Sequence, residues 1–238
     1  MTVKILAMDT SNQPMTVALS ADGVVIDQRV TNEKRNHSLQ LLPYIDEMMH
    51  DAGWQPTDLN RIVVAEGPGS YTGVRIGVTT AKTLAATLHI ELVGVSSLQT
   101  LAANIEDATS LVVPIFDARN QNMYSGVYLA GKNVWADRHN HIDDLVAYLA
   151  TTTQAIMVIG EYANFVDILT TTFGDRVQFA PENDNLPNGG RLAELGANMP
   201  PIENVHTFVP NYLRVSQAEA EWQAKHPNET GNDYVEEV

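Results

Sequence analysis

The order of the predicted secondary-structure elements restricts the fold of this chain more than any other feature of its sequence. Apolar residues on both faces predict a buried strand at 3–8, and two further strand-like runs, 15–20 and 24–31, are separated by Ala-Asp-Gly. An Asp-Gly pair between two such runs is a strong signal for a hairpin. The chain therefore opens with three strands joined by short turns, whereas a doubly wound dinucleotide-binding domain opens with a strand, a helix and a strand.

Two amphipathic helices and two strands come next. A continuous apolar stripe predicts a helix at about 38–52, and a strand at 61–65 leads through a glycine-rich loop into a second helix at about 74–89. A short strand is expected at 92–95. The resulting order, β-β-β-α-β-α-β, is that of the ribonuclease H-like unit, which forms each half of actin, the sugar kinases and the Hsp70 ATPases.

The second part of the chain repeats this order less completely, with strands predicted at 111–116, 122–129, 132–137 and 156–159, and helices near 142–150, 161–172 and 189–198. The sequence therefore predicts an α/β, actin-like fold of two ribonuclease H-like halves, 1–105 and 106–214, each a mixed sheet flanked by helices. A last helix, 217–225, is expected to complete the first half. The acidic end, 226–238, is predicted to be a flexible tail.

The charge balance and the residue types exclude several classes of function. Fourteen Lys and Arg against 29 Asp and Glu give a net charge of −15, so tight RNA binding by this chain alone is not expected. A partner that supplies a basic surface would still allow a role in RNA chemistry. The absence of cysteine rules out a disulfide framework, a thiolate metal site and a cysteine nucleophile, and it fits a reducing cytoplasm.

Membrane and secretion signals are not expected either. No segment reaches the ~20 consecutive apolar residues that span a bilayer. The apolar run near the N-terminus is interrupted by Asp9 and is too short for a signal peptide. We therefore expect cytoplasmic localisation and no membrane partner.

Two segments are candidates for phosphate binding. Asp9-Thr10-Ser11 ends the first predicted strand, where actin-like ATPases carry a phosphate loop, although the same residues suit an ordinary side-chain-stabilised turn. The loop that contains Gly67 and Gly69 precedes the second helix, where an anion cradle would lie. It has neither the Gly-Lys-Ser/Thr of a Walker A loop nor the last glycine of GxGxxG, because a threonine stands in that place. The sequence is therefore compatible with two interpretations of these segments, a nucleotide site and a structural or interface loop.

A metal site is not expected. His37 opens the first helix, but the position one turn later, where a helical histidine pair would have its second ligand, is Leu41. His139 and His141 alternate along a predicted strand with no evident third ligand, and we interpret them as surface residues. No Ser, His and Asp set suited to nucleophilic catalysis stands out.

Several segments, spread in order over nearly the whole chain, resemble one family. They are ILAMDTS at 5–11, GPGSYTGVRIG at 67–77, PIFDAR at 114–119 and PNYLR at 210–214. Together they resemble the TsaB (YeaZ) family, the bacterial subunit of the machinery that makes N6-threonylcarbamoyladenosine in tRNA. The glycine-rich string is the most specific of these matches.

The resemblance implies an actin-like fold and a partner of the same fold, TsaD, which keeps a histidine pair for a metal ion. TsaD transfers the threonylcarbamoyl group to the adenine just 3′ of the anticodon, whereas TsaB binds and supports TsaD without catalysing. A small ATPase, TsaE, joins them. The resemblance thus implies no enzyme activity and no cofactor for this chain alone, with ATP and a metal ion belonging to the partners and tRNA met only through the complex.

Two other interpretations compete with a non-catalytic subunit. An actin-like ATPase or small-molecule kinase that acts alone would bind nucleotide measurably and would place an acidic residue as a base opposite Asp9. A metalloprotease, the older peptidase M22 label of the family, would need a metal ion, which Leu41 disfavours.

The expected partner surface is formed by the two amphipathic helices. It combines the apolar stripe of the first helix with the small residues of the second: Leu41, Leu42, Ile45, Met48, Met49, Gly73, Gly77 and Ala81. The stripe is broad for one small half, and glycines let helices approach closely, so a four-helix arrangement with TsaD is expected. When the chain is isolated, a homodimer through the same face is expected. The alternative is that the whole stripe belongs to the core.

Overall fold

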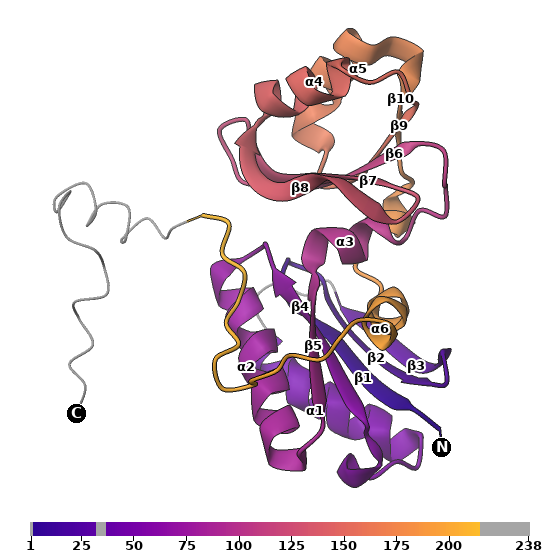
Figure 1. Cartoon of the computed structure of the whole chain (residues 1–238), viewed down its shortest axis with the longest axis vertical. Helices are drawn as coiled ribbons and strands as arrows, with labels where there is room; N and C mark the ends of the chain where they lie inside the picture. The colour runs from indigo at the N-terminus through magenta and orange to yellow at the C-terminus, as the bar shows by residue number, and fades with distance from the viewer. Residues whose placement is uncertain (1, 32–36, 215–238) are drawn as a thin grey trace, which may run out of the picture.

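The first half of the chain is a five-stranded sheet with helices on both faces. The computed structural model describes residues 2–31 and 37–214, and Figure 1 shows two α/β halves, one above the other. The elements of the lower half are β1 (Lys4–Asp9), β2 (Met15–Ala21), β3 (Val24–Thr31), α1 (His37–Asp51), β4 (Arg61–Gly67), α2 (Tyr71–Leu88), β5 (Glu91–Ser96) and, from the end of the described chain, α6 (Gly189–Ala197).

The strand order of this sheet is β3-β2-β1-β4-β5. β1 pairs antiparallel with β2 and parallel with β4, and β4 pairs parallel with β5. The predicted hairpin is confirmed, because β2 and β3 are joined by Asp22 and Gly23, whose φ angles are 48° and 81°. Two successive positive φ angles match the twist of antiparallel strands, and Asp-Gly tolerates them well.

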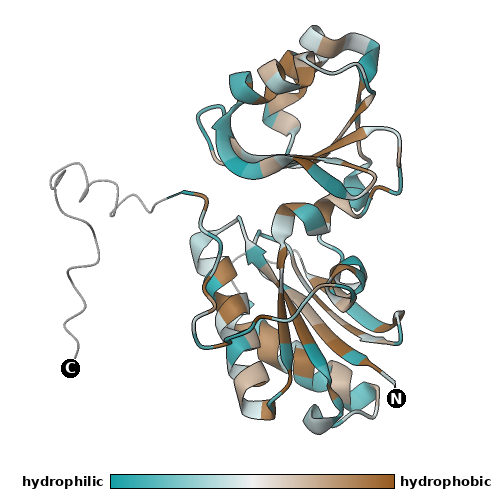
Figure 2. Ribbon diagram, in the orientation of Figure 1, coloured by the Kyte–Doolittle hydropathy of each residue, from teal (hydrophilic) through white to brown (hydrophobic). Residues whose placement is uncertain are grey.

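The two faces of the central strand explain why its sequence is apolar throughout. Leu6 and Met8 face the core beneath α1 and α2, whereas Ile5 and Ala7 face the core beneath α6. Figure 2 shows the hydrophobic colours concentrated on these central strands and on the inner sides of the helices. A strand buried on both faces reads as one continuous apolar run rather than an alternating one.

The second half repeats the strand order of the first. Its sheet runs β8-β7-β6-β9-β10, with β6 antiparallel to β7 and parallel to β9. Its elements are β6 (Leu111–Asp117), β7 (Asn122–Leu129), β8 (Lys132–His141), α4 (Ile142–Ala150), β9 (Ile156–Gly160), α5 (Val166–Phe173) and β10 (Val177–Phe179). This repetition confirms the predicted fold of two similar halves. The sequence did not predict β10, whose three residues are too few for a periodic signal.

A short helix, α3 (Ser97–Ala102), joins the halves and lies between them in Figure 1. Leu98 and Leu101 pack on the second sheet together with Phe116 and Ile159. The two halves are also joined by a hydrogen bond that the Ser96 hydroxyl donates to Asp137.

The predicted boundary between the halves is wrong at its C-terminal end. The expected second half includes α6, but Leu192 and Ala193 of that helix pack against Val63 in the first sheet. Periodicity predicts a helix correctly without indicating which sheet it covers. The expected helix 217–225 and the tail 226–238 lie outside the described residues. In the part of the chain that the structure describes, no helix combines the length and hydropathy needed to cross a membrane.

Candidate functional site

The end of β1 packs directly on the start of α2. The Thr10 hydroxyl donates to the Gly73 carbonyl at 2.7 Å, and the Ser70 amide donates to the Ser11 carbonyl at 2.6 Å. Ser70 also caps α2, because its side chain accepts a hydrogen bond from the Gly73 amide. The two candidate phosphate-binding segments are therefore brought together by the fold, and they bond to each other.

The glycines of this region allow that contact. A Cβ atom on Gly69 or Gly73 would come within 3.0 Å of the backbone carbonyl oxygen of Ser11 or Thr10. A Cβ atom on Gly67 would meet the Asn211 carbonyl equally closely. These glycines allow backbone segments of the same chain to pack closely on one another, which supports the interpretation of the loop as structural.

Asp9 is enclosed rather than presented to a ligand. Its side chain is 2% exposed and accepts a hydrogen bond from the Ser11 amide at 2.7 Å. Burial raises the pKa of the Asp9 carboxyl above its ordinary value, although the hydrogen bonds from Ser11 act in the opposite direction. A small enclosed cavity of about 10 Å³ adjoins Asp9 and is also lined by Ser97 and Asn185. A buried carboxyl of this kind is poorly placed to hold a metal–phosphate group.

An open cleft of about 820 Å³ lies next to these segments, lined by His37, Ser70, Gly73 and Arg119, among others. His37 is already engaged, because its Nε2 lies 2.9 Å from the Gln13 carbonyl. Neither Asp9 nor Gly67 lines this cleft. The cleft is therefore polar and accessible. Ser70 and Gly73 of the glycine-rich segment line it, but none of the five residues predicted to bind phosphate does: Asp9, Thr10, Ser11, Gly67 and Gly69.

The Asp117 carboxylate stabilises the turn that follows β6. The Asp117 carboxylate accepts hydrogen bonds from the Arg119 backbone amide at 2.7 Å and from Asn164 at 2.6 Å. Arg119 adopts a left-handed backbone, with φ 67°, and its side chain lines the open cleft. This left-handed conformation was not predicted from the sequence, because a residue other than glycine, asparagine or aspartate rarely adopts it.

The described residues contain no group of side chains that could bind a metal ion together. No three His, Cys, Asp or Glu side chains lie close enough in the described ranges to hold one ion together. Leu41, which occupies the place of a second histidine after His37, is buried in the core. The residues that the structure describes do not fit the metal site that the peptidase interpretation requires.

The structure corrects most of the predicted partner interface. The first-helix residues Leu41, Ile45, Met48 and Met49 are buried in the core of the first half, against the sheet. The second-helix residues Gly73, Gly77 and Ala81 are also buried. The predicted line of small residues permits close approach to this chain's own β1 and β4, because Thr10 and Val64 are the neighbours of Gly77. The spacing of the small residues in the sequence placed them on one face of α2, but it did not identify which segment packs against that face.

Leu42 is the member of the predicted interface that remains exposed, at 54%. One turn earlier on α1 lies Leu39, exposed at 73%, and Tyr71 at the start of α2 is exposed at 49%. A groove of about 510 Å³ between the two helices is lined by Leu42, Tyr71, Ile76 and their neighbours. We call Leu39, Leu42, Tyr71 and this groove the helix face.

A C-terminal strap, residues 199–214, completes this side of the molecule. It crosses β5 and α2 in Figure 1, and Phe208 inserts into the core of the first half. The Asn211 amide donates to the Glu66 carbonyl at 2.7 Å, and Lys82 donates to the Phe208 carbonyl. Tyr212 then stacks on Tyr71, with ring centroids 4.9 Å apart. Sequence reasoning missed the strap because it lacks regular secondary structure.

Comparisons with known proteins agree on one family. The sequence model described as "TsaD: tRNA N6-adenosine threonylcarbamoyltransferase" matches residues 24–222. The tRNA threonylcarbamoyladenosine biosynthesis protein TsaB of Bacillus subtilis is 39% identical over 223 residues, which cover 92% of this chain and 97% of that protein. The Escherichia coli protein of the same name is 34% identical over 136 residues, 56% of this chain and 58% of its own length.

Solved structures give the same picture. The structure described as YeaZ from Pseudomonas aeruginosa has a TM-score of 0.70 and 25% identity, covering 89% of this chain and all of that one. The ethanolamine utilization protein EutJ from Carboxydothermus hydrogenoformans is similar in fold alone, with a TM-score of 0.52 and 13% identity over 79% of this chain and 88% of that one.

Proposed function

This chain belongs to the TsaB family of tRNA threonylcarbamoyladenosine biosynthesis proteins, and we propose that it is a non-catalytic subunit that binds and supports a TsaD-like transferase. Membership of this family, whose members are named for tRNA threonylcarbamoyladenosine biosynthesis, supports a part in tRNA modification. In this proposal ATP and the metal ion belong to the partners, a TsaE-like ATPase joins the assembly in the cytoplasm, and tRNA is met within the complex.

The lack of catalysis is inferred from how the candidate site is built. Asp9 is buried, and Gly67 and Gly69 pack closely against the backbone of other segments of this chain. The described residues offer no set of metal ligands. An actin-like ATPase or kinase acting alone needs a carboxylate and backbone amides that face the nucleotide. The open cleft does not present Asp9 in this way.

The helix face carries the partner proposal. Leu39, Leu42 and Tyr71 keep large apolar surfaces in water on two adjacent helices, beside a shallow, mainly apolar groove of about 510 Å³. Exposed apolar surface concentrated in one place usually marks an interaction site. A TsaD-like partner of the same fold has the corresponding two helices, so the two faces would pack as four helices. In the absence of that partner, we infer that the chain forms a two-fold homodimer through the same face.

A charge placed on the helix face tests the proposal. Leu39→Glu/Leu42→Glu is expected to abolish copurification with a TsaD-like partner and to shift the isolated chain from dimer to monomer on sizing. The matched control is Val24→Glu/Val25→Glu, because these two residues are also exposed, at 62% and 46%, but lie on the edge strand β3. Circular dichroism checks that each variant is folded.

Two results would contradict the proposal. The first is a folded Leu39→Glu/Leu42→Glu variant that still dimerises and still binds the partner. The second is micromolar ATP binding or stoichiometric metal in the isolated wild-type chain, measured by calorimetry and elemental analysis, which would favour the ATPase or protease interpretation.

A further inference from the structure

The described part of the chain holds eight arginines, which differ in whether a carboxylate compensates their charge. Three are neutralised by nearby carboxylates: Arg29, Arg61 and Arg191. Arg75, Arg138 and Arg214 are exposed, and the described residues place no carboxylate within ion-pair distance of them. Arg119 and Arg176 also have no carboxylate partner among the described residues, but Arg176 donates to the Leu149 and Gln154 carbonyls and Arg119 lines the open cleft. The chain has a net charge of −15, so exposed arginines that no described carboxylate neutralises are local exceptions to its charge.

Two of these arginines pack on aromatic rings. The Arg138 guanidinium lies 4.1 Å from the centre of the Trp135 ring, which also stacks on Tyr148. The Arg75 guanidinium lies 5.2 Å from the centre of the Tyr71 ring, the ring on which Tyr212 stacks. Such packing holds an arginine in place while leaving most of its N–H groups free, because the contact uses the flat face of the guanidinium.

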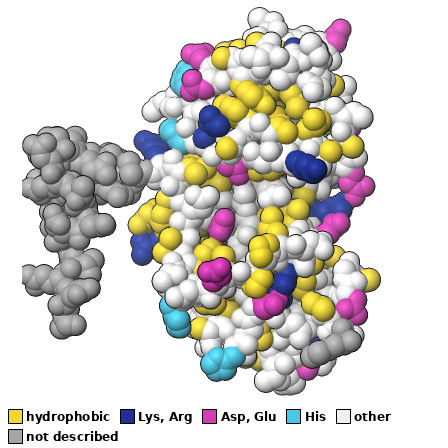
Figure 3. All heavy atoms as spheres, in the orientation of Figure 1, with side chains coloured by type: hydrophobic (Ala, Val, Ile, Leu, Met, Phe, Trp, Pro, Cys, Tyr) yellow, Lys and Arg dark blue, Asp and Glu magenta, His cyan; other side chains and the backbone are white. Residues whose placement is uncertain are grey.

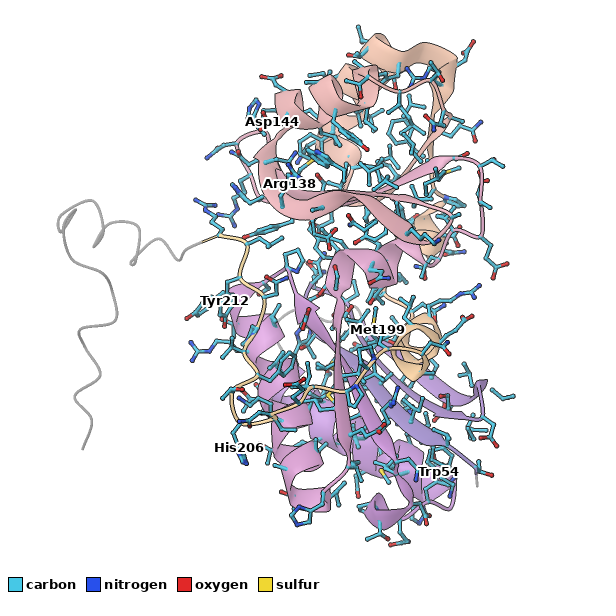
Figure 4. All side chains as sticks on the ribbon, viewed as in Figure 1. Trp54, Arg138, Asp144, Met199, His206 and Tyr212 are labelled. Atoms are coloured by element: carbon cyan, nitrogen blue, oxygen red, sulfur yellow. The ribbon has the colours of Figure 1, made fainter. Side chains whose placement is uncertain are left out.

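The third arginine lies between the two halves of the molecule. Arg214 ends the strap, two residues after Tyr212, and its charge acts on Tyr124 and His139 of the second half. Burial lowers the pKa of His139, and the nearby Arg214 lowers it further. We call Arg75, Arg138 and Arg214 the arginine edge. Figure 4 labels Arg138 and Tyr212 on the same side of the molecule, and Figure 3 shows dark-blue side chains along this side.

The free donors of the arginine edge define the chemistry that it can recognise. Arg138 gives only its Nε to the protein, to the Ala136 carbonyl at 2.9 Å, and Arg75 gives one terminal nitrogen to the Tyr71 hydroxyl at 2.8 Å. The remaining N–H groups form planar forks that suit the paired oxygens of phosphate. The neighbouring rings of Tyr71 and Trp135 are already stacked, so they do not offer a platform for bases.

We propose that the arginine edge binds the phosphate backbone of the tRNA on which the complex acts. This inference rests on the proposed function, and it adds that the chain contacts the RNA itself, without reading its bases. The three arginines come from three segments, with Arg75 on α2, Arg214 at the end of the strap and Arg138 on β8. Arg75 also lines the groove of the helix face, so a partner docked there lies beside this end of the edge, and Arg138 and Arg214 are the residues left to contact RNA.

The experiment compares two double variants of equal charge in the complex with the TsaD-like partner. Arg138→Gln/Arg214→Gln removes two residues of the edge, whereas Arg29→Gln/Arg191→Gln removes two arginines that carboxylates already neutralise. The probe is the substrate tRNA, labelled with a fluorophore, and its dissociation constant is measured by anisotropy at several salt concentrations. Partner binding is measured for each variant by copurification.

We expect both variants to bind the partner as wild type does. The edge variant should bind tRNA roughly tenfold more weakly at low salt, and the slope of log affinity against log salt should become less steep by about 1.8, since each duplex phosphate contact contributes about 0.9. The control variant should keep the wild-type slope.

Other outcomes overturn the inference in distinguishable ways. If the edge variant forms the complex and keeps the wild-type slope, the edge does not contact RNA, while the proposed function stands. If it loses the partner, the edge is a protein-binding surface, which also contradicts RNA binding there. If the wild-type chain does not bind the TsaD-like protein, the proposed function fails, and with it the inference.

Discussion

Substitution of Gly73 by alanine tests whether the small residues of α2 serve this chain's own packing or a partner. Gly73 lies in the first turn of the helix, where helix propensity alone favours alanine by up to about 1 kcal/mol. In this structure, however, the new Cβ atom would lie within 3.0 Å of the Thr10 backbone carbonyl. A backbone oxygen at the end of a buried strand cannot turn aside as a flexible side chain does, so α2 must move away from β1.

The magnitude follows from the contacts that such a movement disturbs. Forcing an extra carbon into a packed core costs about 1–3 kcal/mol. Weakening the bond between the Thr10 hydroxyl and the Gly73 carbonyl costs about 0.5–1.5 kcal/mol more. After the gain in helix propensity, we expect Gly73→Ala to lower the free energy of unfolding by about 1–3 kcal/mol. For a chain of this size, each kcal/mol corresponds to roughly 2–4 °C in Tm.

Urea denaturation followed by circular dichroism measures this loss. The control is Thr87→Ala, an exposed position near the end of the same helix, which should change stability by less than about 0.5 kcal/mol. Copurification with the TsaD-like partner is measured in parallel and should be retained by the folded fraction. A Gly73→Ala variant that is as stable as wild type but no longer binds the partner would refute the packing argument and restore the interface interpretation.

Three further predictions concern the strap and the joint between the halves. Burial raises the pKa of the Glu66 carboxyl above its ordinary value, so the folded chain loses stability as the pH rises through the pKa values of the unfolded and folded states. Glu66→Gln should therefore be more stable than wild type at pH 7 and equal to it at low pH. Denaturation at several pH values measures this difference. Phe208→Ala should cost about 2–4 kcal/mol of unfolding free energy, because the ring fills the core beneath the strap. Asp137→Ala should cost roughly 2–4 kcal/mol in the same assay, since Ser96 and Tyr128 both donate to that carboxylate.

The sequence predicted the helices and strands better than it predicted which other elements they pack against. The leading hairpin, the buried central strand and both amphipathic helices are confirmed, because each depends on local periodicity and turn chemistry. The helix now labelled α6 was also predicted, yet it was assigned to the wrong half. Its apolar face carries no information on which of two similar sheets it covers, and the chain returns to the first sheet only after completing the second.

The same limit explains the errors at the candidate site. A stripe containing Leu41, Ile45 and Met48 is compatible with a core and with an interface, since both bury apolar side chains. The glycines at 73 and 77 indicate close approach without identifying what approaches, which is the backbone of Thr10 at Gly73 and the side chains of Thr10 and Val64 at Gly77. The exposure of Leu42 could not be predicted from the stripe alone. It depends on the orientation of α1 on the sheet, because that orientation decides which edge of the stripe faces water.

The packing of the glycine-rich loop links the two parts of the proposed function, the absence of catalysis and the binding of a partner. In an actin-like ATPase the end of β1 and the loop before α2 must stay open enough to admit phosphates. Here Thr10 and Ser11 close onto that loop through two hydrogen bonds, which fixes the start of α2 against the sheet. The same start carries Tyr71, which holds Tyr212 at the end of the strap and borders the groove of the helix face. Closing the site therefore orients the surfaces through which we propose that the chain binds its partner and RNA, so a variant that reopens the loop should weaken binding at both surfaces together rather than create an enzyme.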